Sequence, residues 1–164
     1  FIILYAGLDT ASNTMTWTLF EILNNPKVYD LIKSEILSNF PDLTKPLNIS
    51  DCESKLKYLE AAIWESMRKH PVVEMFARRV PSEGVTIGDH YLPEKTVITL
   101  NLYAYHNNPK IWKNPREFKI NRWLGEEREK SMENFIGFGS GPRSCIGKDL
   151  AWAELFLVLA NLIR

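Results

Sequence analysis

The stretch that decides this chain is residues 137–147, with the order Gly137-Phe138-Gly139-Ser140-Gly141-Pro142-Arg143-Ser144-Cys145-Ile146-Gly147. Four glycines and a proline surround one cysteine, and an apolar run with helical spacing follows. Glycine adopts backbone conformations that other residues resist, and it lets another body approach the chain closely. A cysteine where a loop turns into a helix faces unpaired N–H groups and the positive end of the helix dipole, which favour a sulfur anion. The stretch therefore predicts a tight loop that presents a sulfur anion to something large and flat.

Composition alone leaves other uses of this loop open. Most free cysteines are small buried hydrophobes, and a glycine-rich loop before a helix can hold a phosphate. Neither glycine fingerprint for phosphate occurs here at the right spacing. A thiol nucleophile would need a histidine nearby, which the order of residues leaves undecided. A phosphatase-type loop would need an arginine six positions after the cysteine, where this chain has Ala151.

The order of residues resembles, without a gap, the haem-binding loop of the cytochrome P450 family, through Phe138-x-x-Gly141-x-Arg143-x-Cys145-x-Gly147. The resemblance implies that Cys145 is the metal ligand, as the axial thiolate of the iron in haem b (iron protoporphyrin IX). It also implies that the other four residues of the motif help to bind the cofactor. Thiolate ligation pushes electron density onto iron and favours cleavage of the O–O bond.

The bulk numbers suit one globular domain. The chain has 164 residues, 45% of them hydrophobic. Acidic and basic residues balance at 20 each, so no overall charge draws the chain to nucleic acid or to a lipid surface. The two cysteines, Cys52 and Cys145, form no CxxC pair, which argues against a disulfide framework and against an all-cysteine zinc site. A reducing compartment fits best.

Both ends of the sequence lie inside apolar periodic patterns. The first residues, 1–8, carry neither an initiator methionine nor the basic start of a signal peptide, and Asp9 follows at once. This run is too short to span a bilayer. We therefore expect a single partial domain over residues 1–164, truncated at both ends, with no transmembrane segment. Membrane contact would then be made only through missing parts.

The first expected helix covers residues 1–23. Glycine inside a helix costs up to about 1 kcal/mol, so Gly7, next to Ala6, calls for a reason such as close approach of a ligand. Thr10 can turn its hydroxyl onto the carbonyl of Ala6 and bend the helix, and Asp9 supplies a carboxylate beside it. The plainer alternative is that Gly7 only allows helix packing and that Asp9 and Thr10 form a polar face.

The order Ala6-Gly7-Leu8-Asp9-Thr10 is similar to the distal helix of the cytochrome P450 family. The resemblance implies that Ala6 and Gly7 lie against the cofactor. It also implies that Asp9 and Thr10 are catalytic and help to relay protons during oxygen activation. Ala11-Ser12 departs from the family, in which a second hydroxyl residue often follows the threonine directly.

A second strong helix is expected over residues 51–69, where Glu65 and Arg68 stand three positions apart and face each other. The ordinary interpretation is a surface pair worth a few tenths of a kcal/mol. The stretch nevertheless resembles the Glu-x-x-Arg helix of the family. The resemblance implies that the pair is buried, that an arginine from a later loop joins it, and that its role is structural.

Strand signals follow this helix. Residues 85–87 and 90–92 flank Gly88-Asp89, which predicts a two-residue hairpin, and residues 96–100 predict another strand. Just before the hairpin, Arg79 resembles the family's arginine that pairs with a haem propionate. An exposed basic residue is the equal alternative.

Residues 114–123 are similar to the family's meander before the haem loop, and Phe118, Arg122 and Trp123 match it. Ile120 and Asn121 depart from it. The resemblance makes Arg122 the expected third partner of Glu65 and Arg68. The run His106-Asn107-Asn108-Pro109 predicts a helix end and turn rather than a metal site, and Gly125–Lys130 predicts a charged, solvated loop without a function.

These motifs imply a mainly α fold with a small β region, a partial cytochrome P450 fold from the distal helix through the start of the helix after the cysteine. The implied function is a haem-thiolate monooxygenase that inserts one atom of dioxygen into a small, lipophilic organic substrate. Electrons would come from an NADPH-dependent reductase, and the parent protein would sit at the cytoplasmic face of the endoplasmic reticulum membrane. The alternatives are a haem-thiolate isomerase or dehydratase, a truncated non-catalytic haem-binding fragment and, more remotely, a thiol enzyme.

Overall fold

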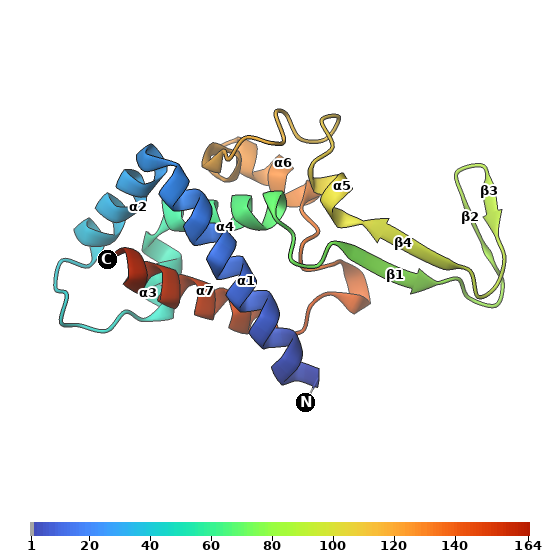
Figure 1. Cartoon of the computed structure of the whole chain (residues 1–164), viewed down its shortest axis with the longest axis horizontal. Coiled ribbons are helices and arrows are strands. Elements are labelled where there is room, and N and C mark those ends of the chain that lie inside the picture. Colours follow the sequence, from blue (N-terminus) through green and yellow to red (C-terminus); the bar gives the residue numbers. More distant parts are fainter. Residues whose placement is uncertain (1) are drawn as a thin grey trace.

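The structure is a computed structural model that describes residues 2–164, with side chains from Leu4 onward. It is mainly helical with two small antiparallel sheets, which confirms the expected fold class (Figure 1). In chain order the elements are α1 (Ile2–Asn24), α2 (Pro26–Asn39), α3 (Ile49–Lys55), α4 (Lys57–Lys69), β1 (Met75–Arg79), β2 (Val85–Ile87), β3 (His90–Leu92), β4 (Val97–Asn101), α5 (Leu102–His106), the 3-10 helix η1 (Ile120–Trp123), α6 (Glu127–Asn134), the 3-10 turn η2 (Gly141–Arg143) and α7 (Lys148–Ile163).

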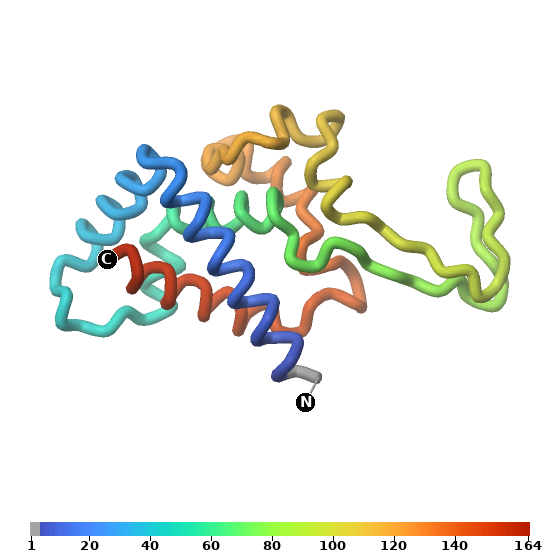
Figure 2. Tube along the Cα trace, viewed as in Figure 1, coloured from blue at the N-terminus to red at the C-terminus, as the bar shows by residue number. Residues whose placement is uncertain are grey.

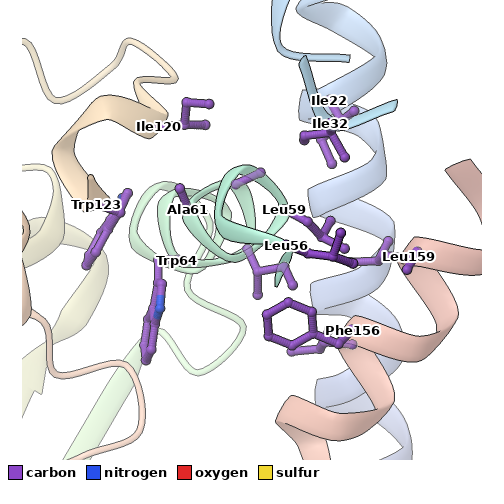
Figure 3. Close-up of a cluster of buried hydrophobic side chains, with 14 of the residues drawn as sticks. Ile22, Ile32, Leu56, Leu59, Ala61, Trp64, Ile120, Trp123, Phe156 and Leu159 are labelled. Atoms are coloured by element: carbon purple, nitrogen blue, oxygen red, sulfur yellow. The ribbon is translucent and has the colours of Figure 1, made fainter. Parts of the chain in front are cut away.

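The helix α4 is the centre of the core. Every residue from Leu59 to Arg68 is buried, and α4 contacts α1, α2, α3, α5, α7 and η1. Figure 3 shows η1 with Trp123 on one side of α4 and α7 with Phe156 and Leu159 on the other. Burying a large apolar side chain stabilises the folded state by about 1.5–3 kcal/mol. The contacts around α4 therefore hold this helix firmly in the core. Any charged group on α4 must then find its partners inside the protein.

The prediction of one helix over residues 51–69 is wrong at Leu56, where the backbone leaves the helical region (φ −100°, ψ 70°). The new helix α4 starts without a capping side chain of its own. Its first N–H groups, those of Tyr58 and Leu59, instead donate to the carboxylate of Glu35 on α2, at 2.9 and 3.2 Å. A carboxylate satisfies the unpaired donors of a helix start and complements its dipole. Because this cap comes from another helix, the local sequence carries no sign of the break.

The strands form an arm that extends away from the helices (Figure 2). β1 pairs antiparallel with β4, with Met75 opposite Asn101 and Arg79 opposite Val97. β2 and β3 form the predicted hairpin, in which Gly88 has a φ of 58° that glycine adopts without strain. Arg79, the last residue of β1, therefore lies out on this arm and not in the helical core.

The helix α1 packs against both α4 and α7. In the view of Figures 1 and 2 the N-terminal half of α1 crosses the start of α7. Within residues 2–164 no helix combines the length and the hydropathy that crossing a bilayer would require. The crossing of α1 and α7 therefore brings the two stretches that the sequence singles out into one part of the molecule.

Candidate functional site

The loop before α7 is held by its own backbone. The N–H of Cys145 donates to the carbonyl of Phe138 at 2.7 Å, and the N–H of Ser144 donates to the carbonyl of Gly141 at 3.0 Å. Gly139 and Gly141 have φ angles of 75° and 66°, which side-chain-bearing residues rarely adopt. The glycines therefore let the chain fold back tightly, and the Cys145 backbone is fixed at the closed end of this turn.

The side chain of Cys145 is exposed and forms no disulfide. Gly147 occupies the N-cap position of α7, and a Cβ added there would lie 4.0 Å from the Cys145 sulfur. Glycine at this position thus leaves that side of the sulfur uncovered. The neighbouring side chains are apolar and face outward, with Ile146 95% exposed and Leu150 64% exposed. The sulfur thus lies on an open surface that carries apolar side chains together with the exposed charged residues Arg143, Lys148 and Asp149.

On α1 the predicted hydrogen bond is confirmed, because the hydroxyl of Thr10 donates to the carbonyl of Ala6 at 2.7 Å. The helix stays continuous through this bond. A Cβ added at Gly7 would meet no atom within 4 Å, and Leu4 and Leu8 on the same helix are largely exposed. Ala6 and Gly7 thus lie on an open, apolar stretch of α1 that could receive a flat ligand.

Asp9 is exposed, and the structure does not bring its carboxylate to Thr10. Among residues 4–164 no hydrogen bond joins these two side chains, because adjacent positions on a helix point about 100° apart. Any proton transfer between the two groups would therefore need a bridging water.

The carboxylate of Glu65 is the centre of a buried polar cluster. Arg68 donates to its two oxygens from Nε and Nη2, both at 2.9 Å, and Arg122 donates from Nε at 3.2 Å. Trp123 adds its indole N–H at 2.9 Å, and Lys119 adds its backbone N–H at 3.0 Å. The structure thus brings Glu65, Arg68 and Arg122 together. It also supplies two donors, from Trp123 and Lys119, that sequence reasoning did not anticipate.

The guanidinium of Arg68 is satisfied by backbone as well. It donates to the carbonyls of His106 and Pro115, at 2.8 and 2.9 Å. Both Glu65 and Arg68 have fully buried side chains, and a buried ion pair is tolerated only when its remaining hydrogen-bonding capacity is used. Because its partners lie on α5 and on the segment before η1, this cluster ties α4 to the chain that leads toward the cysteine loop.

Aromatic rings continue the connection from this cluster to the loop. The ring of Trp123 meets Phe135 edge to face at 5.6 Å, and Phe135 lies 6.5 Å from Phe138, the first residue of the cysteine motif. His106 also stacks on Phe135, with ring centroids 5.1 Å apart. Edge-to-face and offset stacked rings attract beyond their buried area. The cysteine loop is therefore supported by a packed aromatic layer that consists of Trp123, Phe135 and His106.

His106 lies inside this layer with a pKa lowered to about 4, first because burial disfavours its charged form and second because the Arg68 cation is near. It is therefore neutral at pH 7. Its Nε2 accepts the N–H of Ile136 at 3.3 Å, which places the proton on Nδ1, a buried atom without a partner. His106 ends α5 as the sequence predicted, and its carbonyl and ring are used structurally.

This burial predicts an acid-sensitive fold. Between pH 6.5 and about 4 the unfolded chain binds a proton at His106 that the folded chain does not, so the free energy of unfolding falls as pH falls through this range. The loss is about 3 kcal/mol. Urea denaturation at pH 7 and pH 4.5 measures it. His106→Gln should remove most of the decline, whereas His90→Gln, at an exposed strand position, should leave it unchanged. An equal decline in all three proteins would contradict this role of His106.

Arg79, expected to pair with a haem propionate, and Arg143, expected to help bind the cofactor, are both exposed. Within the part of the chain that the structure describes, neither side chain has a hydrogen-bonding or ion-pairing partner. Arg79 ends β1, and Arg143 lies in the cysteine loop itself. The structure therefore leaves both guanidinium groups available, and no contact joins either to the Glu65 cluster.

The expectation that Gly125–Lys130 is a solvated loop is right for the exposure of most of these residues and wrong for the loop itself. α6 begins at Glu127, and Arg128 reaches back to α4, where it donates to the carboxylate of Glu60 at 2.7 Å. A single arginine in a charged run carries no sign of such a distant partner. Trp64 on α4, which packs beside the cysteine loop, was missed for the same reason, because an aromatic residue in an apolar helix stripe suggests only core packing.

Comparison with known proteins decides the family. A family model described as cytochrome P450 matches residues 1–164, which is the whole chain. The chain belongs to the cytochrome P450 family. It is 34% identical over 161 residues to "Probable cytochrome P450 516A1" from Dictyostelium discoideum, and 35% identical over 161 residues to "25-hydroxyvitamin D-1 alpha hydroxylase, mitochondrial" from Homo sapiens.

A third relative, "Cytochrome P450 71B1" from Thlaspi arvense, is 34% identical over 166 residues. Each of the three alignments covers 98% of this chain, but only 33%, 32% and 32% of the respective relatives. The chain thus spans about a third of the length of the cytochrome P450 proteins that it matches.

The residues present fit the thiolate-bound haem that the family implies. A haem is a flat, largely apolar group whose iron needs one ligand from the protein. Cys145 offers an exposed sulfur, and exposed apolar side chains lie near it in the chain and on α1, namely Ile146, Leu150, Leu4 and Leu8. An exposed apolar surface of this kind marks a binding site. The openness at Gly7 and Gly147 leaves clearance on the same surface.

Proposed function

We propose that this chain forms the ligand-bearing part of a haem-thiolate monooxygenase, with Cys145 as the axial thiolate of haem b. The observation that carries the proposal is the exposed Cys145 sulfur on a glycine loop whose backbone is fixed by the hydrogen bond to Phe138. When bound, a thiolate-ligated haem supplies oxygen activation, so that one oxygen atom enters an organic substrate and the other leaves as water.

In that proposal the residues of this chain have separate tasks. Cys145 holds the iron from one side, and Gly147 keeps the approach to its sulfur clear. Phe138 and Gly141 hold the loop in shape through their carbonyls. Arg143 and Arg79 offer guanidinium forks that suit the carboxylates of a haem. Ala6 and Gly7 line the opposite wall on α1, where the open backbone leaves room for dioxygen and substrate.

In the same proposal, Asp9 and Thr10 deliver the protons that oxygen activation consumes. Thr10 Oγ1 gives its hydrogen to the Ala6 carbonyl, so its lone pairs are free to accept a proton donor from the open side of α1. Asp9, exposed to solvent, takes protons from bulk water and passes them on through an intervening water. Such positioned proton transfer contributes on the order of 10²–10⁴-fold to a rate.

The partners follow from the same chemistry. We propose an NADPH-dependent reductase as the electron donor, dioxygen as co-substrate and a small lipophilic substrate, in keeping with the apolar side chains of Leu4 and Leu8. We also propose that the parent protein lies at the cytoplasmic face of the endoplasmic reticulum membrane. The name of the human relative places that protein in mitochondria instead.

The test is oxygen consumption by the complete protein that contains this chain, with a reductase and NADPH. The proposal predicts NADPH-driven uptake of dioxygen coupled to an oxygenated product. A haem-thiolate isomerase or dehydratase would convert its substrate without any uptake. Alkylation of Cys145 together with no binding of haem would instead support a thiol enzyme.

Replacing Thr10 with valine is expected to lower product formation per dioxygen consumed by about tenfold or more, because the hydroxyl that holds the proton is lost. The matched control is Thr16→Val, which removes the same kind of hydroxyl bond to a carbonyl four residues earlier, at 2.8 Å, on an exposed part of α1. Product analysis alongside an oxygen electrode gives the ratio. Equal ratios for the two variants would count against a proton-handling role for Thr10.

A second candidate is a non-catalytic haem-binding fragment, favoured by the wide exposure of the surface around Cys145, with Ile146 95% and Leu4 72% exposed. A haem on so open a surface would be held weakly, and water would reach the site. We therefore expect the 164-residue chain by itself to bind haem weakly and to turn over no substrate. Stoichiometric haem with thiolate-type carbon monoxide absorption in the purified chain would rule out that expectation.

A further inference from the structure

Both ends of the segment that carries Cys145 pack on a single ring, the indole of Trp64 on α4. On the loop side, Phe138 meets Trp64 edge to face, with ring centroids 6.2 Å apart and planes at 90°. On the helix side, Trp152 of α7 lies closer, at 4.4 Å and 36°. Phe138 is also the residue whose carbonyl accepts the Cys145 N–H. The ligand segment is thus clamped at both ends by one buried side chain.

The indole of Trp64 is itself held in orientation. It is 5% exposed, and its N–H donates to Oε1 of Glu60, one turn earlier on α4, at 3.3 Å. Arg128 of α6 donates to the same oxygen at 2.7 Å and to the carbonyl of Trp123 at 3.2 Å. A buried indole N–H needs a partner, so the ring has one preferred orientation as long as Glu60 stays in place.

We propose that Trp64 is a positioning residue for Cys145, and that Glu60 and Arg128 act through Trp64 by fixing the orientation of its ring. The chain of contacts runs from Arg128 to Glu60, from Glu60 to Trp64, and from Trp64 to both Phe138 and Trp152. The charged groups of this anchor, Glu60 and Arg128, differ from those of the Glu65 cluster, and the two groups meet at Trp123, whose ring stacks on Trp64 at 5.8 Å. Its consequence for the axial ligand rests on the proposed function, whereas the clamp on the loop does not.

The first measurement is amide hydrogen exchange on the 164-residue chain without haem. The N–H of Cys145 is bonded to Phe138, so its exchange reports opening of the loop. Trp64→Leu should speed this exchange by about fivefold to tenfold, the factor expected from losing one or two aromatic contacts. The amide of Ile22, whose side chain is fully buried on α1, should change by less than about twofold. A general loss of stability would move both amides together.

The matched control is Trp112→Leu. Trp112 is as buried as Trp64, at 3% exposure, but its ring contacts His106, Trp123 and the Arg68 guanidinium and makes no ring contact with Phe138 or Trp152. Because Trp112 reaches the loop only through His106, Trp123 and Phe135, Trp112→Leu should raise the ratio of Cys145 to Ile22 exchange much less than Trp64→Leu does. If Trp112→Leu and Trp64→Leu raise the ratio equally, the proposal is overturned.

Milder variants keep the test decisive if Trp64→Leu fails to fold. Arg128→Gln changes a half-buried side chain, and Glu60→Gln keeps an oxygen that can accept the indole N–H. Arg128→Gln should speed Cys145 exchange by about threefold in the native background. In a Trp64→Phe background, where no indole N–H remains, it should add nothing, since its effect passes through that ring. Additive effects in the two backgrounds would overturn the proposed path.

A spectroscopic readout extends the test to the complete, haem-loaded protein. Trp64→Leu should lower the thiolate-type fraction of the reduced carbon monoxide adduct, and Trp64→Phe should restore most of it. No change in this fraction, despite faster Cys145 exchange, would overturn the link to the ligand. If no haem binds to the wild type at all, the proposed function fails, while the exchange results still decide whether Trp64 clamps the loop.

Discussion

Replacing Cys145 with serine is expected to weaken haem binding at least about 100-fold and to abolish oxygenation in the complete protein that contains this chain. Changes to groups that merely orient metal ligands already cost 10–100-fold in affinity, and a serine hydroxyl does not donate electron density as a thiolate does. The backbone of the loop should be unaffected, because its hydrogen bonds use main-chain atoms of Phe138, Gly141 and Cys145. Haem titration followed by absorbance measures the affinity.

The control for this prediction is Cys52→Ala. Cys52 is the other cysteine of the chain, and it is fully buried in α3. Removing its sulfur should cost some stability but leave haem affinity within about threefold of the wild type. Similar losses of haem affinity in the two variants would show that haem binding does not depend on Cys145 in particular.

The second large effect is expected at Glu65. Glu65→Ala leaves the buried Arg68 and Arg122 without their carboxylate, and breaking one side of such a pair costs about 3–5 kcal/mol. It also strands the indole N–H of Trp123 and the backbone N–H of Lys119, which both donate to Glu65. The free energy of unfolding from urea denaturation should therefore fall by about 3–5 kcal/mol, a large part of the roughly 5–15 kcal/mol that is typical of a folded domain.

A matched change tests the same chemistry on the surface. Glu133 on α6 is exposed and makes no ion pair among the described residues, so Glu133→Ala should change the free energy of unfolding by less than about 0.5 kcal/mol. Glu65→Gln, which keeps the shape but places an NH₂ among arginines, should fall between the two. If Glu65→Ala were as mild as Glu133→Ala, the cluster would not organise the core as the buried contacts imply.

Several local features followed directly from the sequence. The hairpin around Gly88 was predictable because two β-rich runs flank a two-residue turn, and the Thr10 bond to Ala6 followed from helix geometry alone. The contact of Arg122 with Glu65 was expected only through resemblance to the family. Nothing in the spacing of Glu65 and Arg122, which are 57 positions apart, indicates that they meet.

Other features depended on partners that lie far away in the chain. The break at Leu56 needs Glu35 from α2 to cap the new helix, and Arg128 needs Glu60 from α4. In each case the local pattern favours the simpler outcome, a longer helix or a solvated loop. The contact of Trp64 with Trp152 could not be predicted from the sequence for a similar reason, because both residues fit ordinary apolar helix stripes. Long-range side-chain contacts therefore account for what sequence reasoning missed.

The most direct test of the central claim is the carbon monoxide difference spectrum of the reduced, haem-loaded protein that contains this chain. The account predicts absorption of the thiolate type, present in the wild type and in Cys52→Ala and absent in Cys145→Ser. Haem that binds without this absorption in the wild type, or that retains it in Cys145→Ser, would contradict the assignment of Cys145 as the axial ligand.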